Sequence, residues 1–245
     1  MTRVNRPMIE LKDSPLTQGI WAVYAIVLVV NLTTVGTDRP DVAFVSKILL
    51  MPLLIAWLIA FVKHHRVAIS TTLKLMIVGL VFAWLGDIAL TFSGDAFFAL
   101  GLVCFLIMQV LYILAYRSIP GPGLLKAWPL AWIPFVLLWI VVNVILFGKT
   151  GPMLIPVAVY SLVLVLMSAQ ALDLVIRVDR RYGWITFIGA LLFVASDAVI
   201  AFSAFGVFDE SRAVSIFIMA TYALAQAMIV VGVTYAVCYR AVNDV

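Results

Sequence analysis

Hydrophobic residues in this chain are grouped into eight long runs, separated by short breaks that contain glycine, proline or charged residues. A hydrocarbon layer about 30 Å thick is crossed by roughly 20 helical residues, because lipid offers no hydrogen-bond partner to an open backbone. The runs therefore predict an all-α polytopic membrane protein with eight transmembrane helices. We expect these helices near residues 19–35, 42–62, 72–92, 96–116, 124–147, 153–172, 184–205 and 213–239.

The composition supports this interpretation. The chain is 65% hydrophobic and 11% charged, whereas soluble domains carry roughly 25% charged residues. None of the breaks is long enough to form a separate soluble domain. We therefore expect a short cytoplasmic segment at 1–18, one transmembrane domain at 19–239 and a short cytoplasmic tail at 240–245.

The distribution of lysine and arginine predicts the orientation. Twelve of the sixteen fall on the side that holds both chain ends, three fall on the other side, and Lys47 lies inside a predicted helix. Cytoplasmic loops are enriched in these residues, so both ends are predicted to be cytoplasmic. Topology thus explains the net charge of +4, and no nucleic-acid partner is expected. The predicted location is the cell membrane in a bacterium or the endoplasmic reticulum in a eukaryote, with the lipid bilayer as the surrounding partner.

Three charged residues lie five or more residues from the ends of the predicted transmembrane helices: Lys47, Asp87 and Asp197. Such groups are costly in lipid and usually mark a functional site. Counting about 1.5 Å per residue from the outer ends of the helices places all three roughly 7 to 12 Å below the outer surface. One shared site is therefore expected. Asp173 is interpreted as a residue at the cytoplasmic end of a helix.

The two aspartates belong to an internal repeat. Residues 79–93, GLVFAWLGDIALTFS, align without a gap with residues 189–203, GALLFVASDAVIAFS, and glycine, aspartate, phenylalanine and serine recur at the same offsets. Both segments run from the cytoplasm outward in the predicted topology. The chain is therefore interpreted as two parallel four-helix repeats, and we expect Asp87 and Asp197 to face each other across a pseudo-twofold axis.

Other polar residues in the helices allow two interpretations. They are either substrate-binding groups or hydrogen bonders that hold helices together in lipid, and Lys47 has the further alternative of extending its ammonium to the outer interface. The histidines and cysteines have no spacing typical of a metal or redox site, so neither a metal nor a cofactor is expected. The polar residues in question are Gln109, Tyr112, Tyr160, Tyr222 and Gln226.

Several of these segments together resemble the lysoplasmalogenase family, also called YhhN-like, over about residues 45–230. The resemblance rests on the paired Gly86-Asp87 and Ser196-Asp197 helices, on KILLMPLL at 47–54 and on YALAQ at 222–226. The chain departs from the family pattern at Ile48, where a proline is expected, and at Gln109, where many members carry histidine. The family implies hydrolysis of the vinyl ether bond of a lysophospholipid, lysoplasmalogen with an ethanolamine or choline head group, to a fatty aldehyde and a glycerophospho-alcohol.

Two carboxyl groups suit that chemistry. A vinyl ether is cleaved after its β carbon is protonated, and water then attacks the resulting oxocarbenium ion. We expect one of Asp87 and Asp197 to donate the proton and the other to stabilise the cation, as in glycosidases. Lys47 is expected either to attract the lipid phosphate or to hold one aspartate ionised. The competing prediction is a proton-coupled small-molecule or lipid transporter, because acids in repeated membrane helices also mark transport pathways. The oligomeric state is not predicted.

Overall fold

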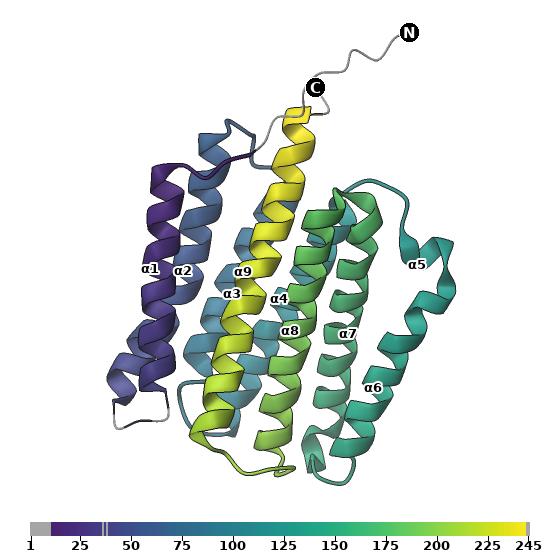
Figure 1. The fold of residues 1–245 in the computed structure, drawn as a ribbon. Helices are drawn as coiled ribbons and strands as arrows, with labels where there is room; N and C mark the ends of the chain where they lie inside the picture. The colour runs from purple at the N-terminus through teal and green to yellow at the C-terminus, as the bar shows by residue number, and fades with distance from the viewer. Residues whose placement is uncertain (1–10, 36, 38, 244–245) are drawn as a thin grey trace.

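The computed structural model describes residues 11–35, 37 and 39–243, and these residues form an elongated bundle of roughly parallel and antiparallel helices (Figure 1). Eight helical segments of this part are long and apolar enough to cross a membrane, as the hydrophobic runs predicted. They comprise α1 (Pro15–Thr34), α2 (Pro40–His64), α3 (Thr71–Ala89), α4 (Asp95–Ser118), η1 with α6 (Pro129–Trp132 and Ile133–Leu146), η2 with α7 (Gly151–Met153 and Leu154–Arg177), α8 (Arg180–Ala204) and α9 (Arg212–Asn243).

Helix starts are fixed by local capping. The Ser14 hydroxyl accepts a hydrogen bond from the Thr17 amide at the start of α1, and Ser70 does the same for Leu73 at the start of α3. These bonds satisfy amides that have no partner within the helix. The first turn of α1 and the last turn of α9 lie at the same end of the bundle (Figure 1), as an even number of crossings requires.

The fifth predicted helix differs from the expected range 124–147. Leu124–Ala127 forms a separate short helix, α5, and the membrane-length segment begins at Pro129. A residue that precedes proline is driven out of the helical region, and Trp128 accordingly has φ −135° and ψ 85°. Pro129 then starts the 3₁₀ turn that leads into α6. The last helix is longer than expected and runs through Asn243 instead of ending at 239.

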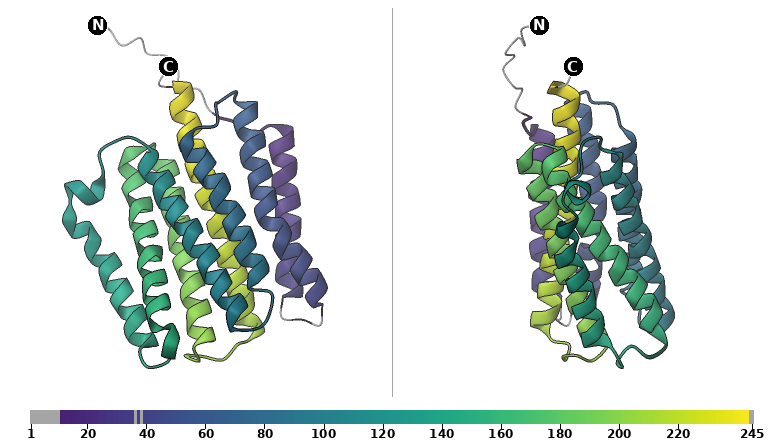
Figure 2. Two further views of the ribbon diagram at one scale, coloured as in Figure 1. Left: turned by 180° about the vertical axis from the view of Figure 1, so that it is seen from behind. Right: turned by 90° about the vertical axis from the view of Figure 1, so that its right-hand side faces the viewer.

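The middle of the bundle is tightly packed, whereas its two edges are open. α2, α3, α4, α8 and α9 supply most of the fully buried side chains. α1 packs mainly on α2, and α6 packs mainly on α7. The left view in Figure 2 agrees with this arrangement, with α1 and α6 at opposite edges of the molecule. Much of the surface of these two helices is therefore free to face lipid.

The repeated glycines mark close helix approaches. A Cβ atom at Gly79 would lie 2.6 Å from the ring of Tyr112 on α4, and one at Gly189 would lie 2.9 Å from the Cβ of Met228 on α9. Glycine thus allows α3 to approach α4 and α8 to approach α9. The glycine that begins each repeated segment therefore has the same packing role in both helix pairs.

The orientation can be tested by cysteine labelling. In a variant whose native Cys104 and Cys238 are replaced by alanine, Lys63→Cys is expected to react with a membrane-impermeant maleimide only in inside-out vesicles. Lys149→Cys is expected to react only in right-side-out vesicles. Both positions are exposed in loops or helix ends at opposite ends of the bundle. The reverse pattern would contradict the predicted cytoplasmic location of both ends.

Candidate active site

Asp87 lies in a polar network between three helices. Its carboxylate is 3.5 Å from the ammonium of Lys47 on α2, and it accepts a 2.7 Å hydrogen bond from the Tyr222 hydroxyl on α9. The Asp87 residue is only 2% exposed. An ionised carboxylate buried among apolar helices is stable only when it is paired and hydrogen-bonded, and Lys47 and Tyr222 provide both interactions.

A proline holds this network in position. Pro52 on α2 has no N–H group, so the carbonyl of Ile48, four residues earlier, lacks its helical donor. The indole N–H of Trp84 on α3 donates to this carbonyl at 2.9 Å. The bond joins α2 to α3 beside Lys47 and about one turn from Asp87. The sequence analysis did not single out Trp84. Pro52 is visible in the sequence, however, and a proline within a helix predicts an unpaired carbonyl four residues earlier.

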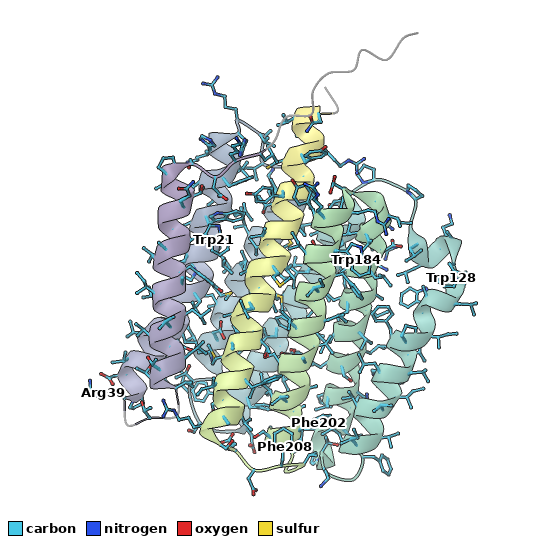
Figure 3. All side chains as sticks on the ribbon, in the orientation of Figure 1. Trp21, Arg39, Trp128, Trp184, Phe202 and Phe208 are labelled. Carbon is cyan, nitrogen blue, oxygen red and sulfur yellow. The ribbon has the colours of Figure 1, made fainter. Side chains whose placement is uncertain are left out.

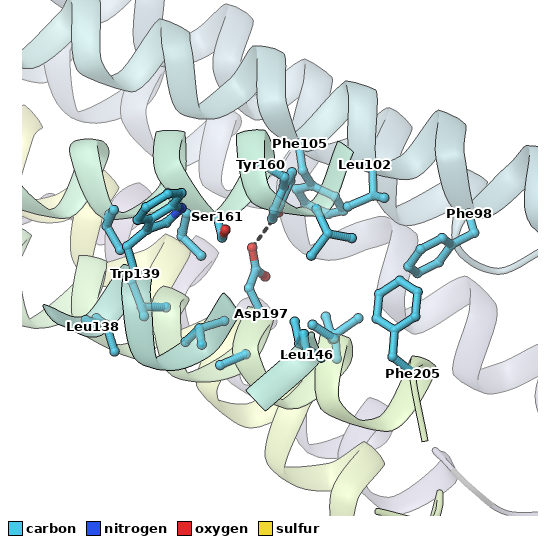
Figure 4. Close-up of a pocket in the computed structure, with 18 of the residues that line it drawn as sticks. Phe98, Leu102, Phe105, Leu138, Trp139, Leu146, Tyr160, Ser161, Asp197 and Phe205 are labelled. Atoms are coloured by element: carbon cyan, nitrogen blue, oxygen red, sulfur yellow. Dashed lines mark hydrogen bonds between the residues drawn. The ribbon is translucent and has the colours of Figure 1, made fainter. Parts of the chain in front are cut away.

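Asp197 lies in a second network. The hydroxyl of Tyr160 on α7 donates a hydrogen bond to Asp197 Oδ2, and no other described residue hydrogen-bonds this carboxyl group. Both side chains line a narrow cavity between α4, α6, α7 and α8. Figure 4 shows them pointing toward each other, with Trp139 and Leu146 of α6 and Phe98 and Phe105 of α4 around them. The cavity is almost entirely apolar apart from Tyr160, Ser161 and Asp197.

The two acids have different hydrogen-bond partners, Tyr222 for Asp87 and Tyr160 for Asp197, and Asp87 does not line the cavity. The Phe105 ring packs edge to face on Tyr222 and on Phe193, with centroids 5.9 Å and 6.3 Å apart. Phe105 lines the cavity on one side and contacts the partner of Asp87 on the other.

The remaining predicted residues lie in the same central region but deeper. Tyr112 donates a 2.8 Å hydrogen bond to Gln226 Oε1, which links α4 to α9. Gln109 is completely buried, and its amide has no hydrogen-bond partner within the described residues. It lies beside the Tyr160 hydroxyl. Tyr160 was predicted to be either a binding group or a packing residue, and the structure brings it to Asp197.

Asp173 has a separate role near the end of α7. It is buried, pairs with Arg177 one turn later, and accepts a 2.9 Å hydrogen bond from the amide of Leu125. These contacts hold the start of α5 against α7. Asp173 therefore fastens a connecting segment and does not contribute to the cavity.

Comparison with known proteins decides the family. The model of the YhhN family matches residues 42–233 of this chain, which is most of its length. The chain belongs to the YhhN family. The search of curated proteins and the search of solved structures each returned no match. The part that matches the YhhN model begins early in α2 and ends within α9, so it contains both polar networks and the whole cavity.

The YhhN-matched region also contains the Pro52–Trp84 connection, whose role can be measured. Trp84→Phe leaves the Ile48 carbonyl without a donor, and a buried unsatisfied group costs about 1 to 3 kcal/mol. We expect a lower Tm in detergent than for wild type or for Trp184→Phe, which alters an exposed tryptophan.

A double-mutant cycle tests the cause. Pro52→Ala restores the helical amide, so Trp84→Phe is expected to cost less in the Pro52→Ala background. Equal costs in both backgrounds would show that the indole does not compensate for the proline.

Proposed function

We propose that this YhhN-family protein is a membrane-embedded hydrolase that cleaves the vinyl ether bond of lysoplasmalogen. The products are a fatty aldehyde and glycerophosphoethanolamine or glycerophosphocholine. The observation that carries the proposal is the Asp197 carboxyl group, held by Tyr160 at the wall of an apolar cavity. A carboxylic acid next to a space suited to hydrocarbon is what protonation of a lipid vinyl ether needs.

In the first step, the carboxylic acid of Asp197 transfers its proton to the β carbon of the vinyl ether. The double bond becomes a C–H bond and an oxocarbenium ion, and Asp197 becomes a carboxylate. Water then adds to the cationic carbon, and the Asp197 carboxylate accepts the proton that this water loses. The resulting hemiacetal separates into the alcohol and the aldehyde. Atoms and charges balance with one water consumed.

The contacts of the two acids support different roles. Asp197 has no cationic nitrogen of a described residue within 4 Å, and Tyr160 occupies Oδ2, which leaves Oδ1 to deliver the proton. Asp87 is paired with Lys47, an arrangement that suits a permanently ionised carboxylate. We assign to Asp87 a negative charge that stabilises the oxocarbenium ion from outside the cavity. Lys47 then holds Asp87 ionised and does not serve the lipid phosphate.

The cavity must widen to hold a fatty chain. Its free space is about 60 Å³, which is room for about two water molecules at roughly 30 Å³ each. α6 forms one wall and is held mainly by α7, so outward movement of α6 is the least costly way to open it. At the non-cytoplasmic end, Phe98 and Phe205 separate the cavity from a wider recess of about 520 Å³ that contains Asp95. We assign the polar head group to this recess.

Aldehyde release from lysoplasmenyl lipid by purified protein in detergent tests the proposal. At matched expression, Asp197→Asn is expected to lower kcat by about 100-fold or more, as loss of a general acid does. Asp87→Asn is expected to lower it less, by about 10-fold, because Asp87 acts through a charge and not through proton transfer.

Hydrolysis needs no sealed compartment, whereas transport is measurable only across one. Turnover retained in both aspartate variants would contradict the mechanism. Absence of turnover in the wild type, together with uptake in proteoliposomes, would favour the transporter.

The proposed binding site of the fatty chain can be tested by substitutions on α6. Val142 lines the cavity, and Val144 on the same helix faces outward with 67% of its surface exposed. Val142→Trp is expected to raise KM and to shift the preference toward shorter fatty chains, because the indole occupies the space. Val144→Trp serves as the matched control and is expected to leave both unchanged. An unchanged chain-length preference in Val142→Trp would place the fatty chain elsewhere.

A further inference from the structure

A second recess lies at the other end of the bundle, where α1 begins. It is a groove of about 380 Å³ between α1, α8 and α9, with α2 behind it, and Asp13, Trp21, Trp57, Tyr182 and Tyr235 line it. Figure 3 shows Trp21 near this end of α1 and Phe208 at the opposite end of the bundle. We call the five residues the aromatic cup. Nothing in the proposed hydrolysis uses them.

The carboxylate of Asp13 in the aromatic cup has hydrogen-bond donors but no cationic partner among the described residues. The Asp13 carboxylate accepts hydrogen bonds from the Trp57 indole at 3.3 Å and from the Tyr235 hydroxyl at 3.0 Å. Within the described residues, no lysine, arginine or histidine nitrogen lies within 4 Å of it. Burial and the adjacent His64 lower the pKa of the nearby His65 imidazole, which disfavours its charged form.

The rings beside Asp13 form a continuous row. Ring centroids are 5.2 Å apart for Trp21 and Trp57, 6.2 Å for Trp57 and Tyr235, and 5.3 Å for Tyr235 and Tyr182. Tryptophan and tyrosine rings attract cations, and sites for quaternary ammonium groups are built from such rings. A carboxylate with no cationic partner next to four aromatic rings has the chemistry of an ammonium site.

The position of the cup identifies the source of the ammonium. Asp13 directly precedes α1, and Tyr182 lies in the first turn of α8, so the cup lies at the level where lipid head groups meet the protein. The exposed Lys12 and Arg181 are the sequence neighbours of Asp13 and Tyr182 and bring positive charge to the same level, where lipid phosphates lie. We infer that the aromatic cup binds the ammonium head group of a zwitterionic bilayer phospholipid.

This site is distinct from the proposed active site. Trp57 lies ten residues after Lys47 on α2, which is about 15 Å along the helix axis. Asp13, Trp21 and Tyr235 also lie outside the residues matched by the YhhN family model. The inference about the aromatic cup therefore does not depend on the proposed reaction. Lipid binding alone tests it.

Native mass spectrometry of the full chain, purified in detergent, tests the inference. The protein is mixed with equimolar dioleoyl phosphatidylethanolamine, phosphatidylcholine and phosphatidylglycerol, and the bound lipids are counted. We expect one or both ammonium lipids to be retained about fivefold or more over phosphatidylglycerol, in line with a desolvated cation–π contact. Asp13→Asn and Trp21→Ala are each expected to remove this preference.

Matched variants separate the cup from general effects. Asp209→Asn removes an exposed acid at the opposite end, and Trp128→Ala removes an exposed tryptophan outside the groove; both are expected to keep the wild-type preference. Unchanged Tm values verify folding of each variant. Equal retention of phosphatidylglycerol by the wild type, or an undiminished preference in Asp13→Asn, would overturn the inference. Tighter retention of soluble choline than of phosphatidylcholine at equal concentration would overturn the assignment to a bilayer lipid.

Discussion

Lipid supplies no hydrogen bonds, and this constraint governs the structure from the backbone to the site. Eight helices satisfy their backbone groups internally, and the one carbonyl that Pro52 frees in α2 is paired by Trp84. The same rule applies to side chains. The acid of each polar network is held by a tyrosine from another helix. Several polar side chains of the membrane-spanning part therefore connect neighbouring helices.

The two repeated aspartates satisfy that constraint in different ways. Asp87 has a cation and a hydroxyl, whereas Asp197 has only a hydroxyl and borders a cavity. Equivalent positions in the repeat have thus acquired unequal surroundings. In the proposed reaction, this inequality lets Asp197 exchange a proton with the substrate while Asp87 stays charged. The difference comes from the neighbours of the acids, which lie on α2 and α9 for Asp87 and on α7 for Asp197.

Much of the fold and part of the site could be predicted from the sequence. Long apolar runs predict membrane helices, because the length and hydrophobicity that a crossing needs are properties of one continuous segment. A single acid in such a run is recognised as a candidate site residue for the same reason. The break before Pro129 was also visible locally but was overridden by the apolar composition around it. The different partners of Asp87 and Asp197 could not be predicted, because they are set by Lys47, Tyr222 and Tyr160, which are distant in the sequence and resemble ordinary helix-packing residues. The link from Trp84 to Ile48 and the cup at Asp13 likewise join residues distant in the sequence.

The contact between Gly86 and Phe105 has a consequence for how this protein tolerates change. A Cβ atom at position 86 would lie 2.8 Å from the Phe105 ring, so any larger residue there pushes that ring toward the cavity. The interface of α3 and α4 is consequently rigid, with Phe105 and Tyr112 seated on glycines. α6 has no such restraint. Larger side chains are therefore better tolerated on α6 than at the interface of α3 and α4.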